Sequence, residues 1–317
     1  MKLRTQIAIL LSVILVFGLF NLVCYELFTK RYIFNRSEGM IAKSIEIDKY
    51  LPWGEDTETV TIDASIKLEG DLPVIDGAAA LYPVFSGIVG STYPESSVIY
   101  DGSDFTSESK LRMNNTMGAY EEIVTGEADI IFCAAPSDEQ LEFARNNNVE
   151  LVLTPIGREA FVFFVNENNP VSDLSVDDVR AIYAGRINNW SEVGGANYPI
   201  THLSRNPGSG SQSTMDRFMD GEPIAFDYDA AFGRCIAFSF RYYVNDLTNY
   251  GGIKILSLNG IYPSIDTISD GSYPLASYFY AVTRADNSNP NVDILLDWIL
   301  SEEGQAVIEA NGYVGVN

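Results

Sequence analysis

Apolar and polar positions divide the chain into an N-terminal apolar run and a long body of alternating strand and helix patterns. Residues 7–23 are apolar except for Ser12, Gly18 and Asn21. Beyond residue 71, short apolar runs typical of buried strands alternate with stretches typical of helices. Strands alternating with helices favour α/β lobes with mixed, largely parallel sheets, in which ligands bind beyond the carboxyl ends of the strands.

The expected elements follow from these runs and from capping residues. Strands are predicted at 72–76, 97–100, 128–132, 151–165, 198–203, 253–256 and 278–282, with an interruption at Gly157. Helices are predicted at 83–89, 115–125, from 136 onward, and at 175–183, 213–219, 292–300 and 303–311.

The N-terminal run is long enough to cross a bilayer. A cleaved signal peptide has small residues at the end of a shorter apolar core, whereas Asn21-Leu22-Val23-Cys24 offers bulky ones. The same residues differ from a lipoprotein cleavage site. We therefore expect an uncleaved signal anchor and its flank in residues 1–36. Basic residues flank both ends of the run, so charge does not decide its orientation, and only the resemblance given below places the N-terminus inside. Residues 37–71, acidic and weakly periodic, are expected to form a stalk or poorly packed lead-in.

Composition limits the classes of function. The net charge is −23, and removing residues 1–36, which carry five basic residues and one acidic residue, leaves −27. Such a body repels nucleic acid and anionic lipid surfaces, so we expect no nucleic-acid partner. A single histidine and three widely spaced cysteines predict no metal site, no cofactor and no enzyme activity. With 317 residues, 46% of them hydrophobic, the chain is long enough for two lobes.

Residues 204–212 are the first candidate for binding a small anion. They lie between a predicted strand and a predicted helix, and two glycines allow a tight turn and close approach to a ligand. Ser209 and Ser211 supply hydroxyl donors, and one of them is expected to cap the helix. The backbone N–H of Gly210 and its neighbours would point at the ligand, and Arg205 adds a fork of charged donors. A Gly/Ser-rich surface loop with an incidental arginine explains these nine residues equally well.

Two further turns could contribute to such a site. Residues 77–81 offer the backbone N–H groups of Ala79 and Ala80, although small residues there also suit simple helix packing. Thr116 starts a predicted helix, and a helix cap without a ligand explains it as well as a ligand contact does. Arg241 is a weaker second candidate for anion contact. A hydrolase that uses Ser209 or Ser211 with His202 lacks a visible third acid.

An ordered set of motifs links these turns to a known family. The motifs are Asp76-Gly77 with Tyr82-Pro83, residues 126–132 followed by Ala135-Pro136-Ser137, residues 174–185 before Asn189-Trp190, Arg205 with residues 208–211, and residues 296–305. From about Leu72 to its end, the chain resembles the phosphate-binding, periplasmic-type solute-binding proteins of ABC transporters, especially the membrane-attached Gram-positive forms.

The resemblance implies a type 2 periplasmic-binding fold whose two lobes are joined by two crossing strands. Lobe 1 would comprise residues 72–156 plus 272–317, and lobe 2 residues 157–271. The matching ligand-binding positions are Arg205, Ser209, Gly210, Ser211, Thr116 and the backbone of Ala79 and Ala80. The globular part would be extracellular, held at the cell membrane by a single pass.

Four positions differ from the family pattern. Ala78 and Ala79 stand where the first turn usually carries Ser or Thr hydroxyls. Ala134 stands where an Asp usually accepts the proton of hydrogen phosphate, and Pro207 replaces an acidic residue that orients the arginine. Losing the acceptor relaxes selection of phosphate over sulfate.

Two functions remain open at this point. The first is capture of inorganic phosphate or a related small oxyanion for uptake through an ABC permease. The second is a sensor or surface-interaction module on the same scaffold, with an altered or lost ligand.

Overall fold

The computed structural model describes residues 18–21, 45–225, 235–247 and 252–316. Residue contacts divide the chain into residues 1–42 and a second unit, residues 43–317. Among the described residues, none of the helices has both the length and the apolar composition that a bilayer span needs. The expected anchor falls mostly outside the described residues. Its described part, residues 18–21, is helical.

Most described strands of the second unit belong to one sheet. Its strand order is β1-β2-β9-β3-β6-β5, and β7 also pairs with β3; β4 and β8 form a separate pair. The strands are β1 Ile75–Gly77, β2 Ile130–Cys133, β3 Leu151–Asn166, β4 Asp173–Leu174, β5 Thr201–His202, β6 Cys235–Phe240, β7 Ile253–Ile255, β8 Ser257–Leu258 and β9 Ala276–Arg284.

The helices begin where a side chain or a turn satisfies the first backbone N–H groups. Ser137, Ser175 and Ser264 form capping boxes at the starts of α4, α5 and α7. The α-helices are α2 Tyr82–Thr92, α3 Asn115–Thr125, α4 Asp138–Asn146, α5 Val176–Tyr183, α6 Gly210–Phe218, α7 Ile265–Ser269, α8 Pro290–Ile299 and α9 Glu302–Ala310. Shorter turns are the 3-10 helices Ile47–Tyr50, Ala79–Leu81, Glu95–Ser97 and Trp190–Val193 and the π-helix Tyr243–Leu247.

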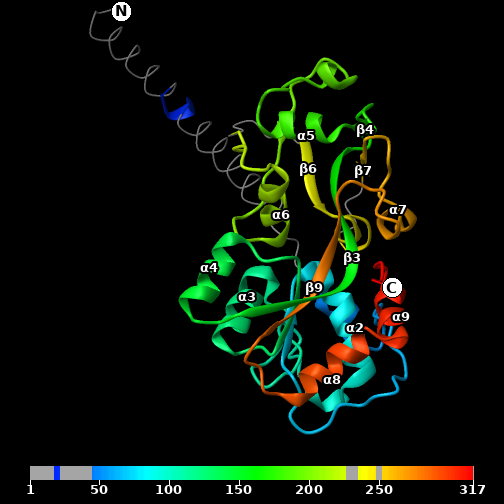
Figure 1. Cartoon of the computed structure of the whole chain (residues 1–317). Helices are drawn as coiled ribbons and strands as arrows, with labels where there is room; N and C mark the ends of the chain where they lie inside the picture. The colour runs from blue at the N-terminus through cyan, green and yellow to red at the C-terminus, as the bar shows by residue number, and fades with distance from the viewer. Residues whose placement is uncertain (1–17, 22–44, 226–234, 248–251, 317) are drawn as a thin grey trace, which may run out of the picture. The chain divides into compact units, whose positions relative to one another are not determined.

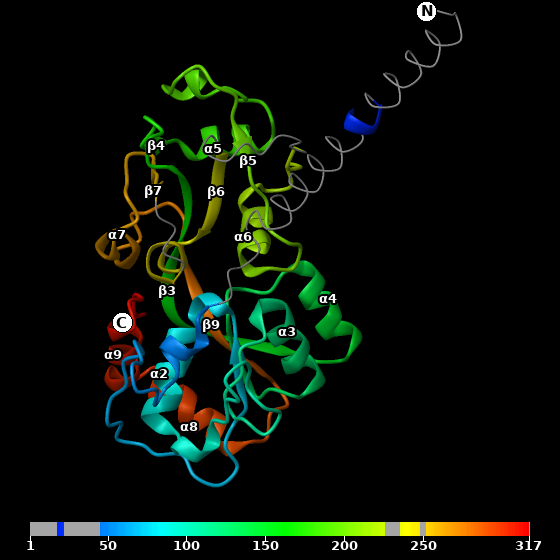
Figure 2. The same ribbon diagram turned by 180° about the vertical axis from the view of Figure 1, so that it is seen from behind.

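Strand β3 runs through two groups of elements. Its first part pairs with β9, from Leu151 opposite Arg284 to Ala160 opposite Ala276, and its second part pairs with β6. Figures 1 and 2 show α2, α3, α4, α8 and α9 around the end of the sheet that contains β1 and β2. We call these helices and strands the lower group. The same views show α5 and α6 beside β5 and β6, which we call the upper group.

The sheet is mixed, as expected, but the prediction of largely parallel sheets is wrong. The pairs β1–β2, β5–β6 and β4–β8 are parallel. Every described pairing of β3 and β9 is antiparallel. The two long strands β3 and β9 run in opposite directions, and β2, β6 and β7 each run opposite to the long strand that they join. The register of β3 shifts between Pro155 and Gly157, and the predicted interruption at Gly157 is confirmed.

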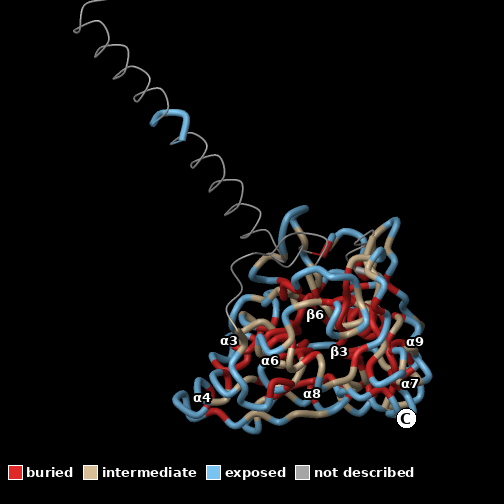
Figure 3. The backbone as a smooth tube through the Cα atoms, turned by 90° about the horizontal axis from the view of Figure 1, so that it is seen from above, coloured by how far each residue is buried: buried red, intermediate tan, exposed pale blue. Residues whose placement is uncertain are grey.

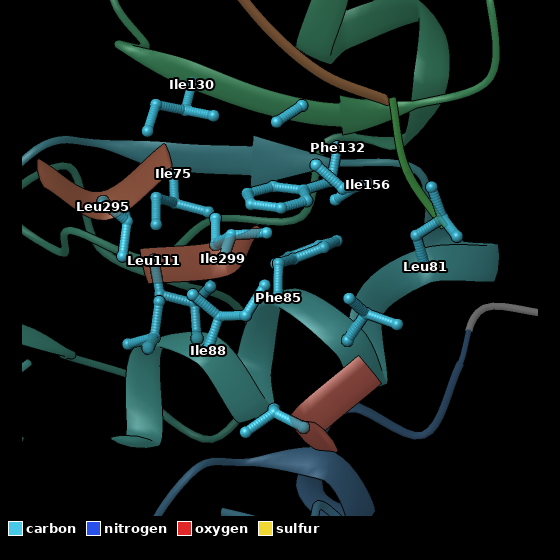
Figure 4. Packing of buried hydrophobic residues seen from close by; sticks show 14 of the residues in the cluster. Ile75, Leu81, Phe85, Ile88, Leu111, Ile130, Phe132, Ile156, Leu295 and Ile299 are labelled. Carbon is cyan, nitrogen blue, oxygen red and sulfur yellow. The ribbon is translucent and has the colours of Figure 1, made fainter. Parts of the chain in front are cut away.

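Each group has an apolar interior. In the lower group, the rings of Phe85 on α2 and Phe132 on β2 stack with centroids 5.5 Å apart (Figure 4). In the upper group, Phe163 on β3 contacts Tyr183 and Phe238. Figure 3 shows buried residues beside the labels of β3 and β6. Burying one such ring contributes about 2–3 kcal/mol to the free energy of folding, so these two interiors stabilise the two groups.

The lead-in packs closely, and the expectation of a stalk or poorly packed lead-in is wrong for residues 45–71. Ile45, Tyr50 and Leu68 are buried in the core of the lower group. The Asn311 side chain accepts a hydrogen bond from Val60 N–H at 3.0 Å and donates one to Val60 O at 2.9 Å. Residues 37–44 lie outside the described residues. The strand expected at 97–100 is also wrong, since that segment contains the end of a 3-10 turn and one isolated bridge.

Candidate functional site

The loop between β5 and α6 has the strand-to-helix form that its sequence predicted. Helix α6 begins at Gly210, and the Ser209 hydroxyl caps it by accepting from Gln212 N–H at 3.2 Å. The Gln212 side chain in turn accepts from Arg205 N–H at 2.8 Å. Gly208 has a φ of +77°, which an L side chain rarely adopts. These bonds close the loop, while Ser211 lies buried in the first turn of α6.

The guanidinium of Arg205 carries an unsatisfied donor. Its Nη1 is shielded from solvent and has no hydrogen-bond partner among the described residues. Leaving a charged donor buried without an acceptor is costly, because the group loses its hydration and gains nothing in return. Such a donor is therefore suited to an acceptor that comes from outside the chain, and a negatively charged oxygen fits it best.

The start of α3 meets the start of α6 across the two groups. A Cβ atom placed on Gly210 would lie 3.0 Å from the Thr116 hydroxyl oxygen. Two residues before Gly210, a Cβ placed on Gly208 would lie 2.7 Å from the sulfur of Met117. Two helix N-termini therefore face the same small region, and both carry the positive end of a helix dipole.

The described α-helices of the second unit differ in how they begin. Helices α4 to α9 all have a Ser or Asn side chain that accepts from the first turn. Helices α2 and α3 have no such side-chain cap. The 3-10 turn that precedes α2 begins after Ala78 and is also uncapped. The first N–H groups at Ala79 and at the start of α3 are thus left for another acceptor.

The first predicted turn, residues 77–81, lies at the same edge of the sheet as the starts of α3 and α6. Gly77 is the last residue of β1 and sits opposite Phe132 of the parallel strand β2. The Ala78 N–H donates to Phe132 O at 2.9 Å, which turns the backbone away from the sheet at Ala79 and Ala80. The carbonyl of Ala80 accepts a hydrogen bond from the Tyr313 hydroxyl.

The segment after β6 connects this turn to α6. The Tyr242 ring packs on the Tyr313 ring with centroids 4.4 Å apart. Two residues earlier, the Phe240 ring lies 3.8 Å from a Cβ placed on Gly210. Between them, Arg241 has a buried Nε with no hydrogen-bond partner among the described residues. The structure therefore brings the three predicted turns together and places Arg241 beside them.

A buried carboxylate lies directly behind the first turn. Asp76 has no exposed surface and accepts hydrogen bonds from Gly77 N–H and from the backbone and side chain of Asn114. Burial raises its pKa from 3.8 to about 6, whereas the hydrogen bonds from Asn114 and Gly77 oppose that shift. Sequence reasoning missed this role of Asp76, although the residue lies in a quoted motif, because its partner Asn114 is 38 positions away.

The remaining predicted positions are placed as follows. Ala134 directly follows β2, and its carbonyl accepts from the Tyr120 hydroxyl at 2.8 Å. His202 lies in β5 with its ring 4.9 Å from that of Tyr183. Ser209 serves as a helix cap, and His202 packs on an aromatic ring. Sequence reasoning also missed Arg217, which donates from α6 to Ala135 O at 3.3 Å and Pro136 O at 3.2 Å.

The fold is a periplasmic-binding-protein-like α/β fold. Residues 100–303 match the family model described as the PBP superfamily domain, and the chain belongs to this family. The chain is 28% identical over 166 residues to the phosphate-binding protein PstS of Bacillus subtilis, an overlap of 48% of this chain and 53% of that protein. It is 24% identical over 220 residues to PstS of Staphylococcus aureus, an overlap of 63% and 67%. The chain thus spans between about half and two thirds of the length of these relatives.

Solved structures agree on the fold. One is a putative phosphate ABC transporter substrate-binding protein from Clostridium perfringens, described with bound phosphate. It aligns with a TM-score of 0.59 and 20% identity, over 77% of this chain and 98% of that one. Another is an ABC-type phosphate transport receptor from Vibrio cholerae. Its TM-score is 0.55 and its identity 17%, over 76% of this chain and 98% of that one.

Proposed function

We propose that this protein is an extracellular solute-binding protein that captures inorganic phosphate or a related small oxyanion for ABC-type uptake. The observation that carries the proposal is the buried Nη1 of Arg205, which has no acceptor among the described residues. It lies in the loop that leads into α6, whose N-terminus meets that of α3. Relatives named phosphate-binding protein PstS support phosphate as the ligand.

In this proposal the ligand lies between two lobes. Lobe 1 comprises residues 72–156 plus 272–317 and lobe 2 comprises residues 157–271, with β3 and β9 as the two crossing strands. The close approach of Thr116 to Gly210 and the hydrogen bond from Arg217 to Pro136 O support closure of the lobes over the ligand. Binding then needs no chemical step, because desolvated hydrogen bonds alone hold the anion.

The proposed donors come from both lobes. Arg205 supplies the charge, Ser209 and Ser211 supply hydroxyl groups, and the N-terminus of α6 at Gly210 supplies backbone N–H groups. Lobe 1 supplies the Thr116 hydroxyl and the backbone N–H groups of Ala79 and Ala80, in a turn that no side chain caps. The Ser209 oxygen accepts from Gln212 N–H, which leaves its own hydrogen free to donate.

Ala134 makes the site less selective than a site with an aspartate there. A methyl group cannot accept the proton of hydrogen phosphate, so it does not favour that ion over a fully ionised one such as sulfate. We expect phosphate and sulfate affinities to differ less than they would with a carboxylate at this position.

The test is isothermal titration calorimetry of the full chain with phosphate and with sulfate. Arg205→Ala should abolish binding of both anions. Arg186→Ala is the matched control, since Arg186 forms an exposed ion pair with Glu222. Arg186→Ala should bind as the wild type does. The proposal is refuted if the wild type gives heat with neither phosphate nor sulfate, or if Arg205→Ala binds them as the wild type does.

The remaining parts of the proposal concern the membrane and the partner. Residues 1–36 would anchor the protein as a single-pass signal anchor, and an ABC permease would receive the ligand. A protease-protection assay on intact cells tests the extracellular location, since added protease should digest the globular part without lysis.

The alternative is a sensor or surface-interaction module without uptake. Ala79 and Ala134 favour it, because both replace side chains that hold phosphate in the resembled family. Deleting the gene distinguishes the two functions. If the protein serves transport, the deletion lowers phosphate uptake by the cells. If it is a sensor module, the uptake rate stays unchanged at fixed permease levels.

A further inference from the structure

The Asp76 carboxylate joins the two lower-group turns of the candidate site. Its Oδ1 accepts from Gly77 N–H at 2.7 Å and from Asn114 N–H at 2.8 Å. Its Oδ2 accepts from Asn114 Nδ2 at 3.0 Å. Gly77 leads into the first turn and Asn114 precedes α3, so one fully buried side chain fixes the backbone on both sides of this half of the site.

The same contacts keep the start of α3 uncapped. Asn114 occupies the N-cap position, but its side chain makes no cap bond to the helix. Its Nδ2 donates instead to Asp76 and to Glu122 Oε1, the latter at 2.8 Å. The next residue, Asn115, has a φ of +61°, a strained value for a residue other than glycine. Asp76 therefore maintains an unusual helix start whose free N–H groups lie next to Thr116.

Asp76 forms no ion pair among the described residues. Glu122 on α3 and Cys133 on β2 are the titratable groups that interact with it electrostatically. Arg112 pairs with Glu122 Oε2 at 3.0 Å, and none of the ion pairs among the described residues includes Asp76. An ionised Asp76 is thus a buried negative charge beside the region where an oxyanion would bind.

We propose that Asp76 is a positioning residue through which oxyanion binding is coupled to proton uptake. The inference rests on the proposed function, because it needs an anion at this edge of the sheet. Two like charges in a buried region disfavour each other, and the one that can take up a proton does so. Burial already raises the pKa of Asp76 to about 6, so a modest further rise places its protonation near neutral pH.

The direction of the pH effect follows from linkage. A bound anion raises the pKa of Asp76 above its value in the free protein. Affinity is then highest below about pH 6 and falls as pH rises from the free pKa to the bound one, by up to about tenfold per pH unit. Above the bound pKa the affinity becomes constant again.

The test measures proton uptake directly. Calorimetric titrations of the full chain with sulfate and with phosphate are run from about pH 5 to about pH 8 in buffers of different ionisation enthalpy. Sulfate does not titrate in this range, and the titration of phosphate itself is the same for every variant. We expect the wild type to take up as much as one proton per sulfate bound, and Asp76→Asn to take up almost none.

Asp129→Asn is the matched control. The Asp129 carboxylate also accepts a backbone N–H, that of Val74 at 2.8 Å, but just before β2 begins, at the opposite end of the β1–β2 pair. This variant should keep the proton uptake of the wild type. Equal uptake in Asp76→Asn and the wild type, or binding by the wild type without any uptake, overturns the proposal.

Two further results separate the possible failures. If the wild type binds neither anion, the proposed function fails and this inference fails with it. If Asp76→Asn does not fold, as seen by circular dichroism, the carboxyl carbon of Asp76 is titrated by NMR in the wild type instead. Sulfate should raise the midpoint of that titration, and an unchanged midpoint overturns the proposal.

Discussion

The Thr116 hydroxyl lies 3.0 Å from the position that a Cβ atom would take on Gly210. This distance is shorter than ordinary van der Waals contact, so a side chain on residue 210 must displace Thr116 or separate the starts of α3 and α6. The glycine therefore allows two helix N-termini from different groups to approach one another. Several consequences of this arrangement can be measured.

Gly210→Ala should weaken phosphate binding by about tenfold or more, because a displacement of a few tenths of an ångström misplaces hydrogen-bond donors on both helices. Thermal stability should stay equal or rise slightly, since alanine favours the helical state over glycine. Calorimetry and thermal unfolding measure the two effects. Gly54→Ala is the control, because a Cβ there would meet only ordinary contacts at 3.5 Å and beyond. Unchanged affinity in Gly210→Ala contradicts the prediction.

Arg217→Gln should weaken phosphate binding by about threefold to tenfold without direct contact with the ligand. The reason is that Arg217 donates from α6 to the carbonyl oxygens of Ala135 and Pro136, which hold the two groups together. Small-angle scattering with saturating phosphate should show a larger fraction of open molecules than in the wild type. Arg186→Gln, which alters an exposed ion pair, should change neither quantity.

The pH dependence of stability should reveal Asp76. Its pKa in the folded state, about 6, is above the ordinary 3.8, so the folded chain binds the proton more tightly than the unfolded chain. The resulting stabilisation is fully present below about pH 4 and is lost as pH rises through about 6, a change of about 3 kcal/mol. Urea unfolding across this range should show it as a difference between the wild type and Asp76→Asn.

Comparing the two proteins removes the opposing effects of other acids. Hydrogen bonds lower the pKa values of Asp101, Asp270 and Glu303, so these groups stabilise the fold at higher pH. Their contributions are common to both proteins and cancel in the difference. A difference that does not vary with pH would show that Asp76 keeps an ordinary pKa in the folded protein.

Gly157→Ala should destabilise the protein by about 1–3 kcal/mol through overpacking at the bulge of β3. A Cβ on Gly157 would overlap the Cζ of Phe279 and lie 3.0 Å from the Val314 carbonyl oxygen. Chemical unfolding of Gly157→Ala, Phe279→Leu and the double variant forms a thermodynamic cycle. The smaller leucine should reduce the cost of the alanine, so strictly additive free energies would argue against this clash.

Local signals in the sequence predicted the local parts of the site. Helix α3 covers residues 115–125, as predicted, and Ser209 caps α6 at the expected turn. Capping residues and glycines act on their immediate neighbours, so their effect can be recognised in a short window. The start of α6 at Gly210, earlier than the predicted 213, differs because Ser211 and Gln212 join the helix once Ser209 caps it.

Other features depend on contacts between distant residues. Asp76 forms a hydrogen bond with Asn114, and Val60 forms one with Asn311. Neither the role of the buried Asp76 carboxylate nor the packing of the lead-in could therefore be recognised from composition. The antiparallel course of β3 and β9 likewise depends on which strands meet in space. Periodicity indicates that a strand is buried but does not identify its partner.

The sequence by itself therefore determined the α/β class, the turns that could hold an anion and the family resemblance, because propensity, capping and motif order are properties of neighbouring residues. Only the tertiary structure decided that these turns meet, that Arg205 has a buried donor without an acceptor among the described residues, and that Asp76 is buried without an ion pair among them. Burial and charge pairing depend on the three-dimensional arrangement, since they arise from residues far apart in the chain.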